Sequence, residues 1–333
     1  MSQSKSVRQC IAGAVVLAAL VLLLPACATR PPATAGPVAA YDVVDNRDVF
    51  TLYAPVIVPQ GQVTSFNRIG QASARLDKKG DEEIYIDPAQ PVYYIQQREF
   101  TTKHGSYTNL IYRVHFERVP FSLIPFYITT GKNGGLFVIV TLNKDRQPVL
   151  ITTVHTCGCY LAFVPTSFLD ENALPVDWPA YSQEVYGEIL PARLGYPDIF
   201  SHDYRTVIYL RSGTHRVMDM KVVPQEQVDT NFQLQRATIA PMGSLKKLPL
   251  GKGTTSFYDN SGGRQGYVKN SVKPLEALLM SWWAFDPHVG VDKEYGNAGK
   301  TGTVFYTSLK PWNRKESDMW EFADFLRFWG WRL

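Results

Sequence analysis

Two apolar runs joined by a short polar stretch form the most strand-like part of the chain. Residues 136–142 are apolar on both faces, residues 148–155 are rich in β-branched side chains, and the five residues 143–147 between them are polar. This pattern predicts a β-hairpin with a loop longer than the tight two-residue type. Because the first run is apolar throughout, we expect a strand that is buried on both sides.

Other strand-like segments occupy much of the chain before residue 260. Residues 107–119 alternate well, with Asn109, Arg113 and His115 on the face opposite Leu110 and Tyr112. We expect that strand to be half-buried, with its polar face exposed to solvent. Four prolines break residues 170–198, for which we expect a loop. The remaining predicted strands are residues 48–58, 82–87, 91–101, 206–210, 217–223 and 232–239.

Helical periodicity appears only late in the chain. Residues 274–285 begin with Pro274, which suits a first helical turn, and carry an apolar stripe that includes Leu278 and Trp282. A second helix is predicted from about residue 314 to 328, because Asn313 and Glu316 have capping-box spacing. This last helix is rich in aromatic residues, and we expect it to cover the sheet rather than to lie on a membrane.

The order of these elements indicates the fold class. Strands dominate residues 41–258 and the two helices follow them. We therefore predict one α+β domain over residues 41–333, with a mainly antiparallel sheet and two late helices, of which the last is C-terminal and aromatic-rich.

The N-terminus has the pattern of a signal peptide. Lys5 and Arg8 precede an uninterrupted run of 14 apolar or small residues, 11–24. That run is too short to span a bilayer comfortably and is typical of a signal-peptide core. Residues 29–40, rich in proline and alanine, are typical of an extended tether.

The run ends in Leu24-Pro25-Ala26-Cys27, which resembles the lipobox of bacterial lipoproteins. The resemblance implies removal of residues 1–26 and acylation of Cys27, which would leave residues 27–40 as the tether. In such lipoproteins a non-acidic residue after the cysteine, here Ala28, implies sorting to the outer membrane. The expected location is therefore the cell envelope, with a body that faces the periplasm and is held to the membrane by its lipid.

Composition narrows the classes of function. Hydrophobic residues make up 45% and aromatic residues 13% of the chain, as in a well-packed globular protein. The formal net charge of +4 falls to about +2 without Lys5 and Arg8. A charge so close to neutral gives no indication of nucleic acid as a partner.

Two cysteines remain once Cys10 has left with the signal and Cys27 has been acylated. Cys157 and Cys159 flank Gly158 at the end of the predicted hairpin. In a flat strand their Cα atoms would lie about 6.7 Å apart, near the upper limit for a disulfide of about 6.8 Å. Because glycine permits a bend, we expect the strand to end or bulge at Gly158.

Three kinds of chemistry could use this stretch. His155, Cys157 and Cys159 are ligand types that suit zinc or cuprous copper, with His115, His202, His215 or His288 as the further ligand. Alternatively, the two cysteines could undergo thiol–disulfide exchange, although no CxxC motif is present.

In the third alternative, Cys157 or Cys159 acts as a nucleophile with a histidine as its base. His288 is the best-placed base, because Asp286 and Asp292 lie close to it in the sequence. The alternative to all three is a disulfide that takes no part in chemistry. The protein would then have a non-enzymatic binding or envelope-maintenance role. We take that role as the leading interpretation, and a metal-dependent or thiol-dependent activity as the alternative.

Overall fold

The computed structural model describes residues 38–43 and 48–333. The predicted signal peptide, Cys27 and most of the tether lie outside these ranges. The described residues comprise a short segment, 122–126, and a body formed by the rest. The first strand of the body, β1, begins at Val38, so the sheet starts inside the range 27–40 that was predicted to be tether.

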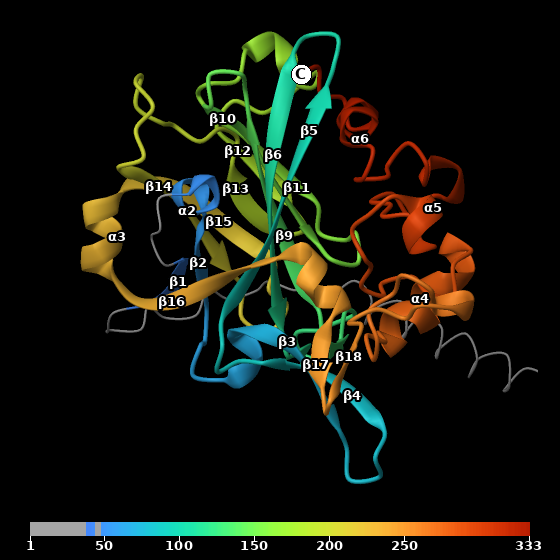
Figure 1. The fold of residues 1–333 in the computed structure, drawn as a ribbon. Coiled ribbons are helices and arrows are strands. Elements are labelled where there is room, and N and C mark those ends of the chain that lie inside the picture. Colours follow the sequence, from blue (N-terminus) through green and yellow to red (C-terminus); the bar gives the residue numbers. More distant parts are fainter. Residues whose placement is uncertain (1–37, 44–47) are drawn as a thin grey trace, which may run out of the picture. The chain divides into compact units, whose positions relative to one another are not determined.

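One large sheet forms the centre of the body (Figure 1). Its strand order is β11-β10-β9-β6-β5-β16-β1-β2-β14-β15, with β3 paired to β6 and β4 paired to β3. The strands of this sheet are β1 (Val38–Val43), β2 (Val56–Pro59), β3 (Ile69–Leu76), β4 (Glu82–Asp87), β5 (Val92–Thr101), β6 (Ser106–Phe116), β9 (Gly135–Leu142), β10 (Pro148–His155), β11 (Ala162–Pro165), β14 (Tyr204–Leu210), β15 (Val217–Pro224) and β16 (Phe232–Pro241).

The predicted mainly antiparallel sheet is confirmed, but its middle is parallel. Strand β16 runs parallel to β1 through residues 232–237 and parallel to β5 through residues 238–241. Strands β2 and β14 form the third parallel pair. Thus β16 joins a half built on β1, β2, β14 and β15 to a half built on β5, β6, β9, β10 and β11.

Short hairpins and helices surround the sheet. The hairpins pair β7 (Arg118–Val119) with β8 (Gly131–Lys132), β12 (Ser182–Val185) with β13 (Glu188–Pro191), and β17 (Leu248–Leu250) with β18 (Gly253–Thr255). The helices are α2 (Val49–Tyr53), α3 (Gln225–Asn231), α4 (Pro274–Ala284), α5 (Ala298–Thr301) and α6 (Phe322–Phe328). Two predictions need correction here, because α2 precedes β2 within residues 48–58 and the predicted loop 170–198 contains the β12–β13 hairpin.

The predicted hairpin of residues 136–155 is confirmed as β9 and β10, and every residue of both strands is buried. Along β9, Phe137 and Ile139 enter one hydrophobic core, whereas Leu136, Val138 and Val140 enter a second core on the opposite face. Both faces of β9 are therefore covered, as its uninterrupted apolar sequence predicted.

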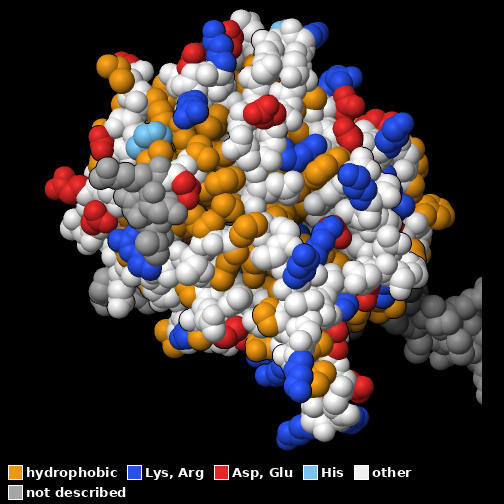
Figure 2. All heavy atoms as spheres, viewed as in Figure 1, with side chains coloured by type: hydrophobic (Ala, Val, Ile, Leu, Met, Phe, Trp, Pro, Cys, Tyr) orange, Lys and Arg blue, Asp and Glu red, His pale blue; other side chains and the backbone are white. Residues whose placement is uncertain are grey.

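The segment after β16 covers one face of the sheet. Its aromatic residues, among them Phe257, Tyr295, Phe305 and Phe325, share the first core with Phe137. In Figure 1 this segment, coloured orange to red, lies beside β5 and β6. Figure 2 shows hydrophobic side chains gathered in the middle of the same view, with charged side chains mostly towards the rim.

The last helix packs on the sheet but is shorter than predicted. Phe322 and Phe325 of α6 contact Phe100 and Phe163 of the sheet, so the aromatic helix docks on the body. It begins at Phe322 rather than near residue 314. The cause is tertiary, since Asp318 forms a β-bridge with Tyr306 and the backbone N–H of Met319 donates to Phe305, which holds this stretch out of helical geometry.

The polar face of residues 107–119 was predicted to be solvated, and this prediction is wrong. Asn109, Arg113 and His115 of β6 are all buried. Arg113 donates to the hydroxyl of Tyr258 and to the carbonyl of Lys293, both from the covering segment. Strand alternation placed these residues on one face correctly, but could not show that a distant part of the chain covers that face.

Helix α4 and the β14–β15 hairpin confirm the predictions for residues 274–285 and 206–223. Across residues 38–43 and 48–333, no helix combines the length and the hydropathy needed to cross a bilayer.

The docking of α6 yields a stability prediction. Phe325→Ala should lower the free energy of unfolding by about 3–5 kcal/mol, because it removes a fully buried ring and leaves a cavity. Ile189→Ala, on the exposed β12–β13 hairpin, should change it by less than about 0.5 kcal/mol. Urea unfolding of both variants measures the difference, and equal losses would contradict the packing described for α6.

Candidate functional site

The site is built on a tight turn that follows β10. The N–H of His155 donates to the carbonyl of Cys159 at 2.9 Å, and the N–H of Gly158 donates to the carbonyl of His155 at 2.8 Å. Gly158 has a φ of +94°, and a Cβ there would lie 2.1 Å from the carbonyl oxygen of Tyr306. The predicted strand end at Gly158 is thus confirmed, and only glycine fits the position.

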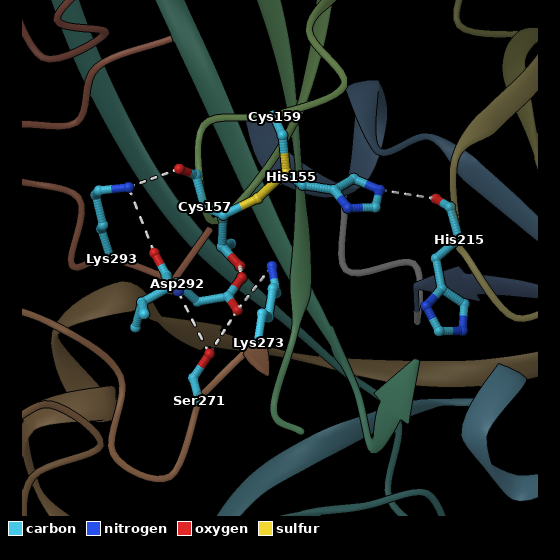
Figure 3. The surroundings of a disulfide bond; sticks show 10 residues. His155, Cys157, Cys159, His215, Ser271, Lys273, Asp292 and Lys293 are labelled. Atoms are coloured by element: carbon cyan, nitrogen blue, oxygen red, sulfur yellow. Dashed lines mark hydrogen bonds and ion pairs between the residues drawn. A yellow bond between two sulfur atoms is a disulfide. The ribbon is translucent and has the colours of Figure 1, made fainter. Parts of the chain in front are cut away.

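The turn brings the predicted sulfur and imidazole groups together (Figure 3). Cys157 and Cys159 form a disulfide with a Cα–Cα distance of 5.6 Å. The sulfur atoms and one ring nitrogen of His155 lie within 4.8 Å of one another. A flat strand would have held His155 and Cys159 about 13 Å apart, so the bend at Gly158 creates this cluster.

His155 is held as a neutral imidazole. Burial lowers its pKa to about 4, and its Nε2 lies 3.2 Å from the carbonyl oxygen of His215. Because a carbonyl can only accept, Nε2 carries the proton and Nδ1 keeps its lone pair. The ring also packs edge-to-face against Tyr160.

A buried polar cluster anchors the other side of the turn (Figure 3). Lys293 Nζ donates to the carbonyl of Cys157 at 2.6 Å, and the Lys293 N–H donates to the carbonyl of Thr156 at 2.8 Å. Asp292 accepts from the hydroxyls of Thr156 and Ser271 and pairs with Lys273 at 3.3 Å. The turn is therefore fixed to a segment more than a hundred residues later in the chain.

Two charged side chains of this cluster, Asp292 and Lys293, have pKa values shifted from their usual ranges. Burial lowers the pKa of Lys293 to about 8, although Asp286 and Asp292 favour its charged form. Burial alone would raise the pKa of Asp292, but Lys273 and the two hydroxyls outweigh it and lower the pKa. Within the described ranges, Lys293 has no carboxylate at ion-pair distance and relies on carbonyl oxygens and on the ring of Tyr306, 4.4 Å away.

The disulfide borders a pocket of about 180 Å³. Most of its lining is apolar or aromatic, and the residues that matter chemically are Cys157, Cys159, Tyr160, Tyr186, Glu276 and Tyr306. Cys157 is buried whereas Cys159 is partly exposed, so Cys159 is the more accessible residue of the pair.

Glu276 of α4 is the unusual member of this pocket. Its side chain is buried, and its Oε2 has no hydrogen-bond partner among the described residues. Burial raises the pKa of Glu276, with Asp292 acting in the same direction and Lys273 and Lys293 in the opposite one. Burial thus favours the neutral form of this carboxyl more than in an exposed glutamate.

His115, proposed as a further metal ligand, is not part of the cluster. Its Nε2 accepts from Arg113 Nε at 2.8 Å, and its Nδ1 faces the carbonyl of Gly134 at 3.3 Å. Burial lowers its pKa well below the usual value. Both ring nitrogens are thus engaged, and the side chain helps to bury Arg113.

The other histidines are also placed apart from the sulfur atoms. The His288 ring packs on Tyr267, and it does not line the pocket. Neither Asp286 nor Asp292 hydrogen-bonds to that ring in the described structure; Asp286 accepts from Tyr306 and from the His288 backbone instead. The ring of His215 stacks on Phe116.

His202 packs against Tyr53 and Phe200, and thus takes part in a separate aromatic cluster.

Sequence reasoning missed Glu276, Lys293 and the tyrosines of the pocket. One signal was available, since Glu276 is the only ionisable residue of an otherwise apolar helix. A single carboxylate on such a helix is either exposed to solvent or functional. The hydrophobic periodicity of the helix does not by itself separate these two alternatives.

Comparison with known proteins returns no significant match to a protein-family model, to a curated protein or to a solved structure. The function must therefore be argued from the site itself.

The fit of Gly158 can be tested against a matched glycine. Gly158→Ala should cost about 3 kcal/mol or more, because a strained φ is combined with a backbone clash. Gly80→Ala, at a φ of +86° with open space around the added methyl, should cost about 1 kcal/mol. Chemical denaturation gives both values, and similar losses for the two variants would show that Tyr306 does not confine the turn.

The buried neutral histidines predict acid sensitivity. The pKa values of His155 and His215 are lowered to about 4 and about 3, whereas the unfolded chain has values near 6.5. The unfolded state therefore binds more protons below pH 6.5, and each histidine should cost about 2 kcal/mol of stability by pH 5.

Glu276, with its raised pKa, acts in the opposite direction, so variants rather than the total slope provide the test. The stability of His155→Gln should depend less steeply on pH between 6.5 and 5 than that of the wild type. The exposed control His104→Gln should keep the wild-type slope. Equal slopes for all three proteins would mean that His155 is not held neutral.

Proposed function

We propose that this protein is a lipid-anchored envelope protein whose periplasm-facing body carries out thiol–disulfide exchange at Cys157 and Cys159. The observation that carries the proposal is the placement of the disulfide in the wall of a pocket that also contains the carboxyl of Glu276, whose Oε2 has no hydrogen-bond partner among the described residues. The lipid anchor rests on the sequence around Cys27.

The disulfide adds little to the stability of the fold. It closes a loop across a single residue, and in the chain-entropy account stabilisation grows with loop length. The turn is already held by its own backbone hydrogen bonds and by Lys293. A chemical use therefore explains the two cysteines better than a structural one does.

The exchange reaction follows from the accessibility of the two sulfur atoms. A thiolate of a partner dithiol attacks Sγ of Cys159, the bond between the sulfurs breaks, and Cys157 leaves as a thiolate. The second partner thiolate then attacks the partner sulfur of the mixed disulfide and releases Cys159. The partner becomes a disulfide, and this protein becomes a dithiol with the two protons that the partner lost.

Two groups of the site favour these steps. The ammonium of Lys293 donates to the backbone carbonyl of Cys157, and a positive charge bound to this residue would lower the basicity of the leaving thiolate. The neutral form of Glu276, favoured by burial, can supply a proton to a released sulfur in the same pocket.

A second candidate function is metal binding by the reduced pair. Nδ1 of His155 and two thiolates would provide three ligands that suit zinc or cuprous copper, and one ring nitrogen of His155 already lies within 4.8 Å of both sulfur atoms. In the structure the two sulfurs are bonded to each other, so this function requires prior reduction.

Glutathione exchange tests the proposal. Under native conditions reduced glutathione should open the wild-type disulfide. Cys157→Ser, which leaves Cys159 free, should form a mixed disulfide with oxidised glutathione on the order of tenfold faster than Cys159→Ser, because the Cys157 sulfur is buried. Peptide mass mapping assigns the adducts and separates them from Cys10 and Cys27.

The other outcomes identify the competing functions. A disulfide that resists glutathione until the protein unfolds would overturn the exchange reaction and leave a binding or envelope-maintenance role. One zinc or copper ion per reduced chain, lost in Cys157→Ser and measured by elemental analysis, would favour the metal site instead.

A further inference from the structure

Helix α4 exposes a continuous apolar face. Leu278 and Trp282 each retain 72% of their accessible surface and Phe285 retains 77%, while Leu279 and Trp283 are about half exposed. Residues 278, 279, 282 and 283 are spaced so that they share one side of the helix, and Phe285 follows at its C-terminal end.

This face carries no charge. Glu276 is the only ionisable residue of α4, and it is buried, because it points into the pocket together with Met280. A solvent-exposed helix normally presents charged or polar residues outward. A cluster of large apolar side chains without such residues marks an interaction surface.

We propose that the exposed face of α4 docks on the surface of the lipid bilayer that anchors the protein. The proposal rests on the lipid anchor of the proposed function. Ten residues, 28–37, separate Cys27 from Val38, and even fully extended they reach only about 35 Å. The body is thereby kept at the membrane, where an apolar face meets lipid far more often than any free partner.

The composition of the face suits the interfacial zone of a bilayer. Tryptophan prefers this zone, because its ring is apolar and its N–H is polar, and leucine and phenylalanine enter the acyl boundary beneath it. An amphipathic helix lying in this zone buries its apolar side by about 5–10 Å.

Basic side chains lie next to the C-terminal end of α4. Arg314 donates to the carbonyl of Ala284, which ties the loop around residues 311–315 to the C-terminus of α4. Lys310 before this loop and Lys315 within it are exposed, as is Trp312, and the exposed acid Glu316 follows Lys315. The basic side chains can contact lipid phosphates while Trp312 adds to the interfacial aromatic groups.

Docking would also fix the position of the pocket. Glu276 and Met280 line the pocket from the side of α4 that faces away from Leu278 and Trp282. The disulfide would then lie about one helix diameter, roughly 10 Å, from the lipid surface. Partner thiols that reach Cys159 would in this case belong to molecules at the membrane.

Quenching of tryptophan fluorescence by brominated lipid tests the proposal. The full lipid-anchored chain is reconstituted in vesicles of phosphatidylethanolamine and phosphatidylglycerol with brominated acyl chains. Wild-type fluorescence should be strongly quenched, and Trp282→Phe combined with Trp283→Phe should remove most of the quenched signal. Leu278→Ser combined with Leu279→Ser should weaken quenching of Trp282 and Trp283 by about threefold or more, because it removes much of the apolar area of this face.

Controls separate this proposal from the proposed reaction. Ile189→Ser, at an equally exposed apolar residue outside α4, should leave quenching unchanged, and so should Cys157→Ser. Glutathione exchange should be unaffected by the leucine substitutions in detergent solution. Unquenched Trp282 and Trp283 would overturn the proposal, as would cross-links from position 282 to a second copy of the protein.

Discussion

The structure of the site depends on the buried contacts between Thr156-Cys157 and Asp292-Lys293. Both charged side chains are fully buried, and each is satisfied only by groups that fold against it: hydroxyls and Lys273 for Asp292, carbonyl oxygens for Lys293. Removal of one partner from such a pair leaves an uncompensated buried charge, which typically costs about 3–5 kcal/mol. These contacts therefore require the late segment and the turn after β10 to fold together.

These contacts hold the turn through bonds other than its disulfide. The backbone of residues 155–159 is closed by its own hydrogen bonds and lies against Tyr306. In the proposed reaction, the bond between Cys157 and Cys159 would therefore open while its surroundings stay in place. Helix α4 connects this turn to the surface, since one side of the helix carries Glu276 into the pocket and the opposite side exposes Leu278 and Trp282. Chemistry and membrane contact would thus share one element.

Sequence patterns predicted those features that depend on near neighbours in the chain. The β9–β10 hairpin, the β14–β15 hairpin, helix α4 and the bend at Gly158 all follow from side-chain alternation, helical spacing or the freedom of glycine. Two predictions that were wrong have the same cause, which is contact with residues distant in the sequence. The polar face of β6 was predicted to be solvated because nothing near it in sequence shows that Tyr258 and Lys293 cover it. The last helix was predicted too long because its first turns are drawn into a β-bridge with Tyr306.

The sequence by itself determined that two cysteines flank a flexible residue at the end of a buried hairpin, beside a histidine. Those facts arise from local backbone preferences, which extend over only a few residues. Only the tertiary structure decided that a ring nitrogen of His155 lies near the sulfurs while His115 and His288 lie apart from them. It also decided that Glu276 enters the pocket with its Oε2 unpartnered among the described residues, and that an apolar face of α4 remains exposed in the described structure. Burial and pKa are set by groups brought together from distant parts of the chain, and no local pattern encodes which groups those are.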